Sequence, residues 1–563
     1  MKNVIFILLR RMRLPLILLV GAFALSTVGL TLIPGIDPHG NPWYVDFFHA
    51  FYFVSFLGTT IGLGEIPHPF SPAQRMWITF AIYLTVIVWV YALGALLAIL
   101  QDPAFRRVIK WSTFSRAVTR VSEPFYIMCG YGDTGSALVV ELAHRRIQTV
   151  VIDINQERID ALALEDLGFY IPGLAANSAD TETLFAAGLS HKKCLGVMAL
   201  TNDDTVNLKI ASTSKLLAPR LKVVCRAEHH ETEANMRSLG TDHIVNPFDS
   251  FAERLGMAIH SPNLYLVYEW LTSPTGAPLA KAIHPPRTRW VVCGYGRFGK
   301  AVERYLTFEG IRMVIVEADP KKTHAPKNAV IGTGTQDVTL RDARIEEAGG
   351  IIAGTDNDTS NLAIVLTAKE LNPNLFTIAR QNQRGNDAIF AALNSSLVMQ
   401  PSAIIARKVL ALVTTPLLSE FLHAVRHEDE AWVTDLAQRI STVAPEESPD
   451  TWTIRVSRAH TPAVEATIAE GIHLRLAAIC ANPHDRLRKL ACLPLLLRRG
   501  ENDLLLPDSS VELRSGDRIL FCGQEGVASE MQWALNNVNV LDYIVTGNER
   551  PTGWAWRWLA KRY

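Results

Sequence analysis

The chain has 563 residues, of which 48% are apolar and 20% are charged. This length exceeds that of a typical single domain, so several domains are expected. Lys and Arg together number 55, as do Asp and Glu, and this balance argues against a protein that binds nucleic acid. The seven cysteines form no Cys-x-x-Cys pair, and several lie inside apolar, strand-like runs, which indicates reduced, packed thiols.

Two long uncharged segments, residues 14–33 and 78–100, lie near the N-terminus. Each is long enough to cross the roughly 30 Å hydrocarbon core of a bilayer as a helix. Lys and Arg residues precede the first segment and follow the second, so the positive-inside tendency places both termini in the cytoplasm. A signal peptide is disfavoured, because no small residues mark a cleavage position after the first segment. The sequence therefore predicts a multi-pass protein embedded in a lipid bilayer.

A pore loop, residues 43–66, is expected between the two segments. Its first part is aromatic but too short to cross the bilayer, which favours a re-entrant helix. Alternating glycines then let successive carbonyls face the same way. Four such strands can replace the water around K⁺ with their carbonyl oxygens. One loop per chain therefore implies a homotetramer. Gly94, deep in the second segment, is either a close helix contact or a bending point near a gate. The predicted filter residues are Thr60, Ile61, Gly62, Leu63 and Gly64.

An internal repeat occupies the middle of the chain. In each copy a strand-like run leads into a Gly-x-Gly-x-x-Gly turn, and a second strand ends in an acid, Asp153 or Glu317. Such glycines let a pyrophosphate approach a helix N-terminus, and the acid accepts hydrogen bonds from ribose hydroxyls. The alternative is that the glycines serve only tight packing of helix on strand. The two sets of glycines are Gly130, Gly132 and Gly135, and Gly294, Gly296 and Gly299.

The two copies differ in length at one place. From Asp153 to Thr201 the chain advances 48 residues (201 − 153), but from Glu317 to Thr355 it advances only 38 (355 − 317). In a doubly wound fold this stretch carries a crossover helix and the third strand, beside the adenine. The two nucleotide pockets are therefore expected to differ in shape.

The fold class expected from these patterns is a membrane α-helical pore followed by two tandem α/β Rossmann-like domains and a small α+β C-terminal module. Short β-rich runs and turn residues near the C-terminus predict that module. The expected division is a pore domain at 1–100, a gating linker at 101–124, Rossmann-like domains at 125–285 and 286–430, the C-terminal module at 431–543 and a tail at 544–563.

This combination resembles prokaryotic ligand-gated potassium channels with two tandem regulator-of-K⁺-conductance (RCK, or TrkA-N type) domains per chain. The resemblance implies a bacterial or archaeal inner-membrane channel, and a cytoplasmic ring of eight regulator domains gated by NAD(H) or another adenine nucleotide. Leu63 stands at the usual Tyr position of the filter and Glu65 at the usual Asp, which leaves the strictness of K⁺ selectivity open. Further nucleotide contacts are expected at Asp133, Thr134, Asn177, Thr201, Arg297, Phe298 and Thr355.

Some members of that family open on Ca²⁺ held by carboxylates, and Glu228 is the candidate ligand here. Adjacent residues of a helix rarely point at one ion, so a solvated helix start is the favoured interpretation of residues 228–231. Two other functions stay open. One is a membrane-anchored NAD-dependent oxidoreductase, although neither glycine turn is followed by a recognisable catalytic domain, so enzymatic activity is not expected. The other is the regulatory subunit of a separate K⁺ transporter, which the filter motif argues against.

Overall fold

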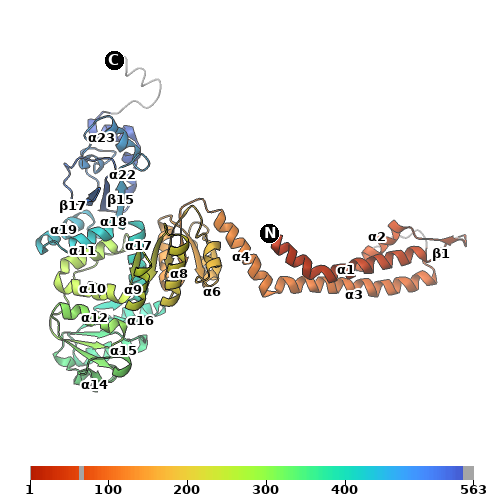
Figure 1. Ribbon diagram of the computed structural model, residues 1–563, viewed down its shortest axis with the longest axis horizontal. Coiled ribbons are helices and arrows are strands. Elements are labelled where there is room, and N and C mark those ends of the chain that lie inside the picture. Colours follow the sequence, from red (N-terminus) through yellow and green to blue (C-terminus); the bar gives the residue numbers. More distant parts are fainter. Residues whose placement is uncertain (1, 38, 62–68, 549–563) are drawn as a thin grey trace, which may run out of the picture. The chain divides into compact units, whose positions relative to one another are not determined.

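The computed structural model describes residues 2–37, 39–61 and 69–548 (Figure 1). The chain divides into two compact units, Met1–Val121 with Ala186–Gly188, and Ser122–Phe185 with Leu189–Tyr563. The first unit contains the apolar helices, and the second contains two parallel sheets and a smaller antiparallel sheet.

Two helices of the first unit are long and apolar enough to span a membrane. They are Met12–Leu32, the apolar part of α1 (Lys2–Leu32), and α3 (Pro72–Gln101). Between them, α2 (Phe47–Gly58) is apolar but too short to span, and the pair β1 (Gly35–Ile36) and β2 (Pro42–Trp43) precedes it. The two predicted spans and the short helix between them are confirmed.

Close packing holds these three helices together. A Cβ on Gly29 of α1 would lie 2.0 Å from the ring of Trp77 on α3, so only glycine fits there. The indole Nε1 of Trp77 also donates to the carbonyl of Ser26 at 3.1 Å. At Gly94, by contrast, an added Cβ would meet no atom of the described chain within 4 Å, so packing within this chain does not require that glycine. The core of the unit contains Leu30, Val45, Ala50, Phe53, Phe56 and Ile78.

The predicted linker, residues 101–124, is largely helical. After α3 ends, the Asp102 side chain accepts the N–H of Ala104 at 2.7 Å and begins α4 (Pro103–Thr119). Proline suits the first position of a helix because an N–H group at that position would have no acceptor within the helix. The chain therefore leaves the apolar helices through a second, capped helix.

Each glycine repeat forms a six-stranded parallel sheet, in the orders β5-β4-β3-β6-β7-β8 and β11-β10-β9-β12-β13-β14. Counted within each sheet, both orders read 3-2-1-4-5-6, the doubly wound topology that binds dinucleotides where the order reverses. The predicted Rossmann-like folds are confirmed. The strands are β3 (Phe125–Cys129), β4 (Gln148–Asp153), β5 (Gly173–Ala175), β6 (Cys194–Ala199), β7 (Lys222–Arg226), β8 (His243–Val245), β9 (Trp290–Cys293), β10 (Met313–Glu317), β11 (Val330–Ile331), β12 (Gly350–Ala353), β13 (Phe376–Arg380) and β14 (Leu397–Met399).

The flanking helices show where the second copy is shorter. The crossover helix after β4 is α6 (Gln156–Leu164), whereas the one after β10 is only α13 (Pro320–Thr323). The shortening thus falls on this crossover helix and the third strand, as expected. The other flanking helices are α5 (Asp133–His144), α7 (Thr181–Ala186), α8 (Asp204–Leu217), α9 (His230–Ser238), α12 (Arg297–Phe308), α14 (Asp337–Asp342), α15 (Asp358–Leu371) and α16 (Asp387–Ala392).

The two Rossmann-like folds exchange helices. The chain leaves the first sheet through α10 (Pro247–His260), which packs in one core with α12 of the second fold. It leaves the second sheet through α17 (Pro401–Thr414), which packs in one core with α5 of the first. Each fold therefore buries apolar side chains supplied by the other.

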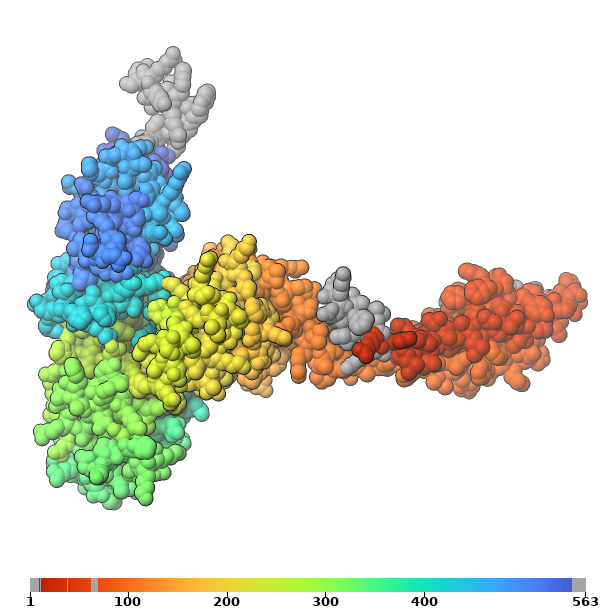
Figure 2. Space-filling view, viewed as in Figure 1, coloured from red at the N-terminus to blue at the C-terminus, as the bar shows by residue number. Residues whose placement is uncertain are grey.

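The C-terminal part is an antiparallel sheet of order β15-β18-β16-β17 with helices on it, so the predicted α+β module is confirmed. Its inner strands share a core with α11 (Pro262–Thr272), α18 (Pro416–Val425) and α19 (Glu430–Val443). Figure 2 shows this module in blue beside α18 and α19 in cyan. Its elements are β15 (Asp450–Arg455), α20 (Pro462–Ala469), α21 (Leu476–Ile479), β16 (Cys492–Arg499), β17 (Asn502–Leu505), β18 (Arg518–Gly523), α22 (Val527–Asn536) and α23 (Val538–Thr546).

The exchange predicts a large effect for Phe298 on α12. Its ring is fully buried, 6.0 Å from that of Phe248 and 5.5 Å from that of Phe251 on α10. Phe298→Ala should lower the free energy of unfolding by about 3–5 kcal/mol, because it leaves a cavity between the two folds. Phe308→Ala on the same helix, where the ring is 88% exposed, should change it by about 0.5 kcal/mol or less. Urea unfolding of the purified chain measures both, and equal losses would contradict the exchange.

Candidate functional site

The described part of the pore loop ends where α2 ends. Thr59 is the C-cap of that helix, and its backbone N–H donates to the carbonyl of Ser55. Thr60 has a φ of +60°, and the N–H of Ile61 donates to the carbonyl of Phe56 at 3.1 Å. The remaining predicted filter residues, Gly62, Leu63 and Gly64, lie outside the described residues, so the filter stays a prediction.

The first and third glycines of each turn are required by the fold itself. Gly130 has a φ of +101° and Gly294 a φ of +94°, in the region that favours glycine. A Cβ on Gly135 would lie 2.0 Å from the carbonyl oxygen of Gly130, and one on Gly299 would lie 2.2 Å from that of Gly294. Tight packing of helix on strand therefore explains these four glycines without any ligand.

The middle glycines are not explained in this way. Gly132 has a φ of −84° and Gly296 a φ of −75°, which any residue adopts. An added Cβ would come no closer than 3.5 Å to Arg158 at Gly132, and would meet nothing within 4 Å at Gly296. Both residues also begin helices, α5 and α12, to which no side chain supplies a cap. The open space and the uncapped N–H groups are what a bound phosphate would use.

The two acids brace their own turns. Asp153 is buried and accepts the backbone N–H of Tyr131 at 2.6 Å and that of Asn155 at 2.8 Å. Glu317 accepts the corresponding N–H of Tyr295 at 2.6 Å. A carboxylate has about four acceptor positions, so Asp153 keeps capacity for a ribose hydroxyl. It is nevertheless also a structural residue.

Thr201 and Thr355 are held by equivalent buried amides. The Oδ1 of Asn207 accepts both the N–H and the hydroxyl of Thr201, at 3.0 and 2.8 Å. Asn361 does the same for Thr355, at 2.9 and 2.7 Å. These hydrogen bonds fix the start of the turn that follows β6 in the first copy and β12 in the second, opposite the glycine turn.

A cavity of about 530 Å³ opens at the glycine turn of the first copy. This volume lies within the range of small-molecule and cofactor sites, roughly 300–1,000 Å³. Of the predicted contacts in the first copy, all but Gly135 line it: Gly130, Gly132, Asp133, Thr134, Asp153, Asn177 and Thr201.

Part of the wall of this cavity comes from the second copy. Arg380, at the end of β13, and Asn382 line the cavity. Asp358 holds Asn382 in place by accepting its backbone N–H at 2.7 Å and its amide Nδ2 at 2.8 Å. Burial alone would raise the pKa of Asp358, but the hydrogen bonds from Asn382, Asn386 and Gln383 together hold it below its ordinary value. Residues of both folds thus form one cavity.

Two predicted contacts of the second copy point elsewhere. The guanidinium of Arg297 pairs with Glu228 of the first copy at 2.8 Å and lies over the ring of Phe248. The side chain of Phe298 is fully buried against α10 and cannot reach a ligand. Because α10 comes from the other copy, the sequence motif gave no sign of these partners.

Glu228, the candidate Ca²⁺ ligand, lies among cations. Its carboxylate pairs with Arg226 and with Arg297, and Arg380 lines the same cavity. Burial lowers the pKa of Arg380, while the charge of Glu228 opposes that shift. Two neutralising guanidinium groups disfavour a bound cation, so the geometry does not favour Ca²⁺ at Glu228.

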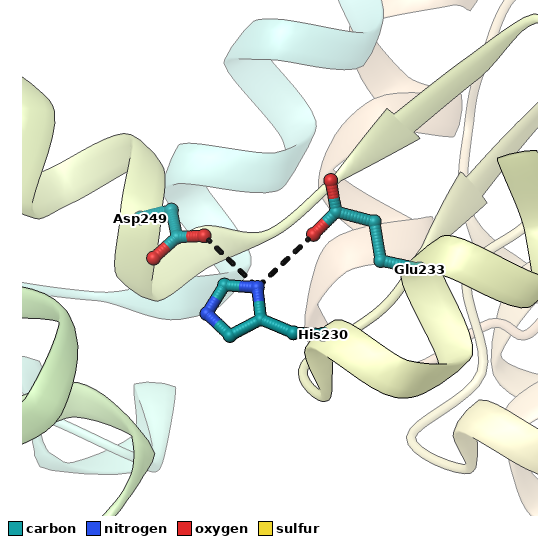
Figure 3. Close-up of side chains that lie close together, drawn as sticks. All are labelled: His230, Glu233 and Asp249. Atoms are coloured by element: carbon teal, nitrogen blue, oxygen red, sulfur yellow. Dashed lines mark ion pairs between the residues drawn. The ribbon is translucent and has the colours of Figure 1, made fainter.

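A second group of possible metal ligands lies nearby, on α9 and α10. Figure 3 shows Glu233 and Asp249 on either side of His230, whose Nδ1 is 3.5 and 3.6 Å from their carboxylates. Arg237 contacts Glu233 at 2.7 Å, and Arg304 contacts Asp249 at 2.5 Å. These arginines occupy the same carboxylates, and the group is best described as an ion-pair cluster.

The sequence patterns did not predict several residues that line the cavity at the first glycine turn. Arg158 on α6 is one of them, and its spacing from Asp153 at the end of the preceding strand could have indicated it. Arg226 is another, and it is the last residue of β7. No comparable signal exists for Arg380 and Asn382, because their place depends on how the two copies pack.

Comparison with known proteins agrees with the two folds. The TrkA-N domain family model matches residues 126–247 and 290–401. Potassium channel protein 1 of Methanocaldococcus jannaschii is 26% identical over 147 residues, which cover 25% of this chain and 44% of that protein. The voltage-gated potassium channel Kch of Escherichia coli is 23% identical over 208 residues, covering 37% of this chain and 48% of that protein.

The matched part spans less than half the length of these two relatives. Among solved structures, the GsuK channel bound to NAD is similar over 95% of this chain and 99% of its own, with 14% identity and a TM-score of 0.47. The family matches coincide with the two parallel sheets described above. The chain therefore carries two tandem TrkA-N domains.

Proposed function

We propose that the chain is the subunit of a homotetrameric potassium channel whose opening depends on an adenine nucleotide, such as NAD(H), bound at the first glycine turn. The observation that carries this proposal is the pairing, on one chain, of two membrane-length apolar helices around a short apolar helix with a cavity at a TrkA-N glycine turn. The permeant ion would be K⁺, passing a filter at residues 60–64. Ca²⁺ is not part of the proposal.

The same proposal places the protein in the inner membrane of a bacterium or archaeon, with both termini in the cytoplasm. Four chains would supply eight TrkA-N domains to one ring. We infer the domain division given above from this arrangement, with the linker helix α4 between pore and ring. The relatives named above are potassium channels, which favours this function over an NAD-dependent oxidoreductase.

Conduction can be tested directly. Proteoliposomes containing the purified chain should take up ⁸⁶Rb⁺ in a way that responds to NAD⁺, NADH, ADP or ATP added one at a time. Gly62→Ala should abolish uptake, because alanine disfavours the backbone angles that turn a carbonyl toward the pore. The variant should still elute as a tetramer. If the wild-type tetramer takes up no ⁸⁶Rb⁺, the chain is better explained as the regulatory subunit of a separate transporter.

The nucleotide site has a sharper test in its middle glycine. A Cβ at Gly132 makes only an ordinary contact, so Gly132→Ala should keep the wild-type melting temperature. It should nevertheless weaken nucleotide binding on the order of tenfold to a hundredfold, because the added Cβ occupies the space through which a phosphate would approach the N–H groups at the start of α5, and hydrogen bonds to charged groups contribute about 1.5–3 kcal/mol. Isothermal titration calorimetry with NAD⁺, NADH, ADP and ATP measures this. Gly296→Ala is the matched control on the other turn, and equal loss in both variants would contradict assignment to the first copy.

The acid at the end of β4 sets the expected choice of dinucleotide. Asp153 would accept hydrogen bonds from ribose hydroxyls but would repel a 2′-phosphate at the same position. NADH should therefore bind more tightly than NADPH in the same calorimetric experiment. Tighter binding of NADPH would place the adenosine ribose away from Asp153.

A further inference from the structure

A second cavity lies where four helices meet, and two of them are the exchanged helices α10 and α17. It has a volume of about 160 Å³ and is lined by residues of α10, α11, α17 and α18. None of its lining residues lines the cavity at the first glycine turn. The two cavities are therefore separate sites.

Positive charge is in excess around this cavity. Arg254 and Arg407 share one carboxylate, that of Glu269, at 2.6 and 3.5 Å. Arg426 pairs with Glu253. The fourth cation, on α17, has no carboxylate within ion-pair distance among the described residues: the Nζ of Lys408 donates to the hydroxyl of Ser250 on α10 at 3.1 Å. Four cations thus face two carboxylates.

A buried donor at the same place also lacks a partner. The Nε of Arg254 is buried and makes no hydrogen bond within the described part of the chain. Its guanidinium lies 5.9 Å from the centre of the Tyr268 ring, which lines the cavity too. Buried polar groups are nearly always hydrogen-bonded, so this donor is an exception, and other atoms of the Arg254 side chain line the cavity. Burial also lowers the pKa of Lys408, and an anion beside it would offset that effect.

We propose that this cavity binds a small phosphate-type oxyanion between the two TrkA-N domains. Lys408, Arg254 and Arg426 would be its ligands, since ammonium and guanidinium groups bind phosphate through charge-assisted hydrogen bonds. The volume restricts the ligand to inorganic phosphate or a short phosphomonoester. Because Arg254 lies on α10 while Lys408 lies on α17, the anion fastens the exchanged helices of the two domains to each other.

Binding can be measured on the full chain in detergent, by calorimetry with inorganic phosphate and with glycerol phosphate at constant ionic strength in chloride. Lys408→Met keeps the side-chain length and removes the charge, and should weaken binding on the order of tenfold to a hundredfold. Lys209→Met, at an exposed position on α8, is the matched control and should bind as the wild type does. Tighter binding of glycerol phosphate would identify a phosphomonoester as the ligand, and tighter binding of phosphate the free anion.

A second pair of variants locates the site. Ala411→Leu fills the cavity from α17 and keeps all four cations, so it should also abolish binding, and it replaces Lys408→Met if that variant does not fold. Arg158→Gln, in the nucleotide cavity, should leave phosphate binding unchanged. The proposal is overturned if the wild type binds no phosphate, if Ala411→Leu binds it as the wild type does, or if Arg158→Gln is the variant that loses it.

Discussion

The constraint on which the second unit depends is the exchange of helices between its two Rossmann-like folds. α10 leaves the first sheet and buries Phe248 and Phe251 against Phe298 of the second fold. α17 leaves the second sheet and buries Ile405 and Val409 in the core of the first. Neither fold can rotate on the other without exposing apolar surface of both, which costs roughly 25 cal/mol for each Å². The pair therefore behaves as one body joined through its helices.

This exchange explains why the cavity at the first glycine turn has walls from both copies. Arg380 ends β13 of the second sheet, yet its guanidinium lies 4.9 Å from the ring of Phe248, which α10 carries over from the first copy. Arg297 is held over the same ring and pairs with Glu228 across the junction. Equivalent positions of the repeat thus have different tasks in the two copies. Asp133 lines the cavity in the first copy, whereas Arg297, at the equivalent position of the second, pairs with Glu228 across the junction.

Much of the fold could be predicted from local patterns. The glycine turns, the acid after the second strand and the uncharged segments each depend on neighbouring residues, and the sheets and helices formed where those patterns lie. The site was less predictable, since Arg380 and Asn382 reach the cavity only through packing between copies. The motif also placed Phe298 at a ligand, whereas its side chain belongs to the core. A motif fixes where backbone can approach a phosphate, but the direction of a side chain depends on partners distant in sequence.

The geometry also separates what the glycines do for the fold from what they do for a ligand. Gly130 and Gly135 would be needed even in an empty domain, because of a positive φ in one case and a 2.0 Å approach in the other. Gly132 meets neither condition, so the fold alone does not explain it. A ligand can shift an equilibrium only if it binds one arrangement more tightly than another. A nucleotide that touches the turn at Gly132 and also Arg380 satisfies this requirement, because its contacts on the two sides are complete only when the two folds keep the arrangement described here.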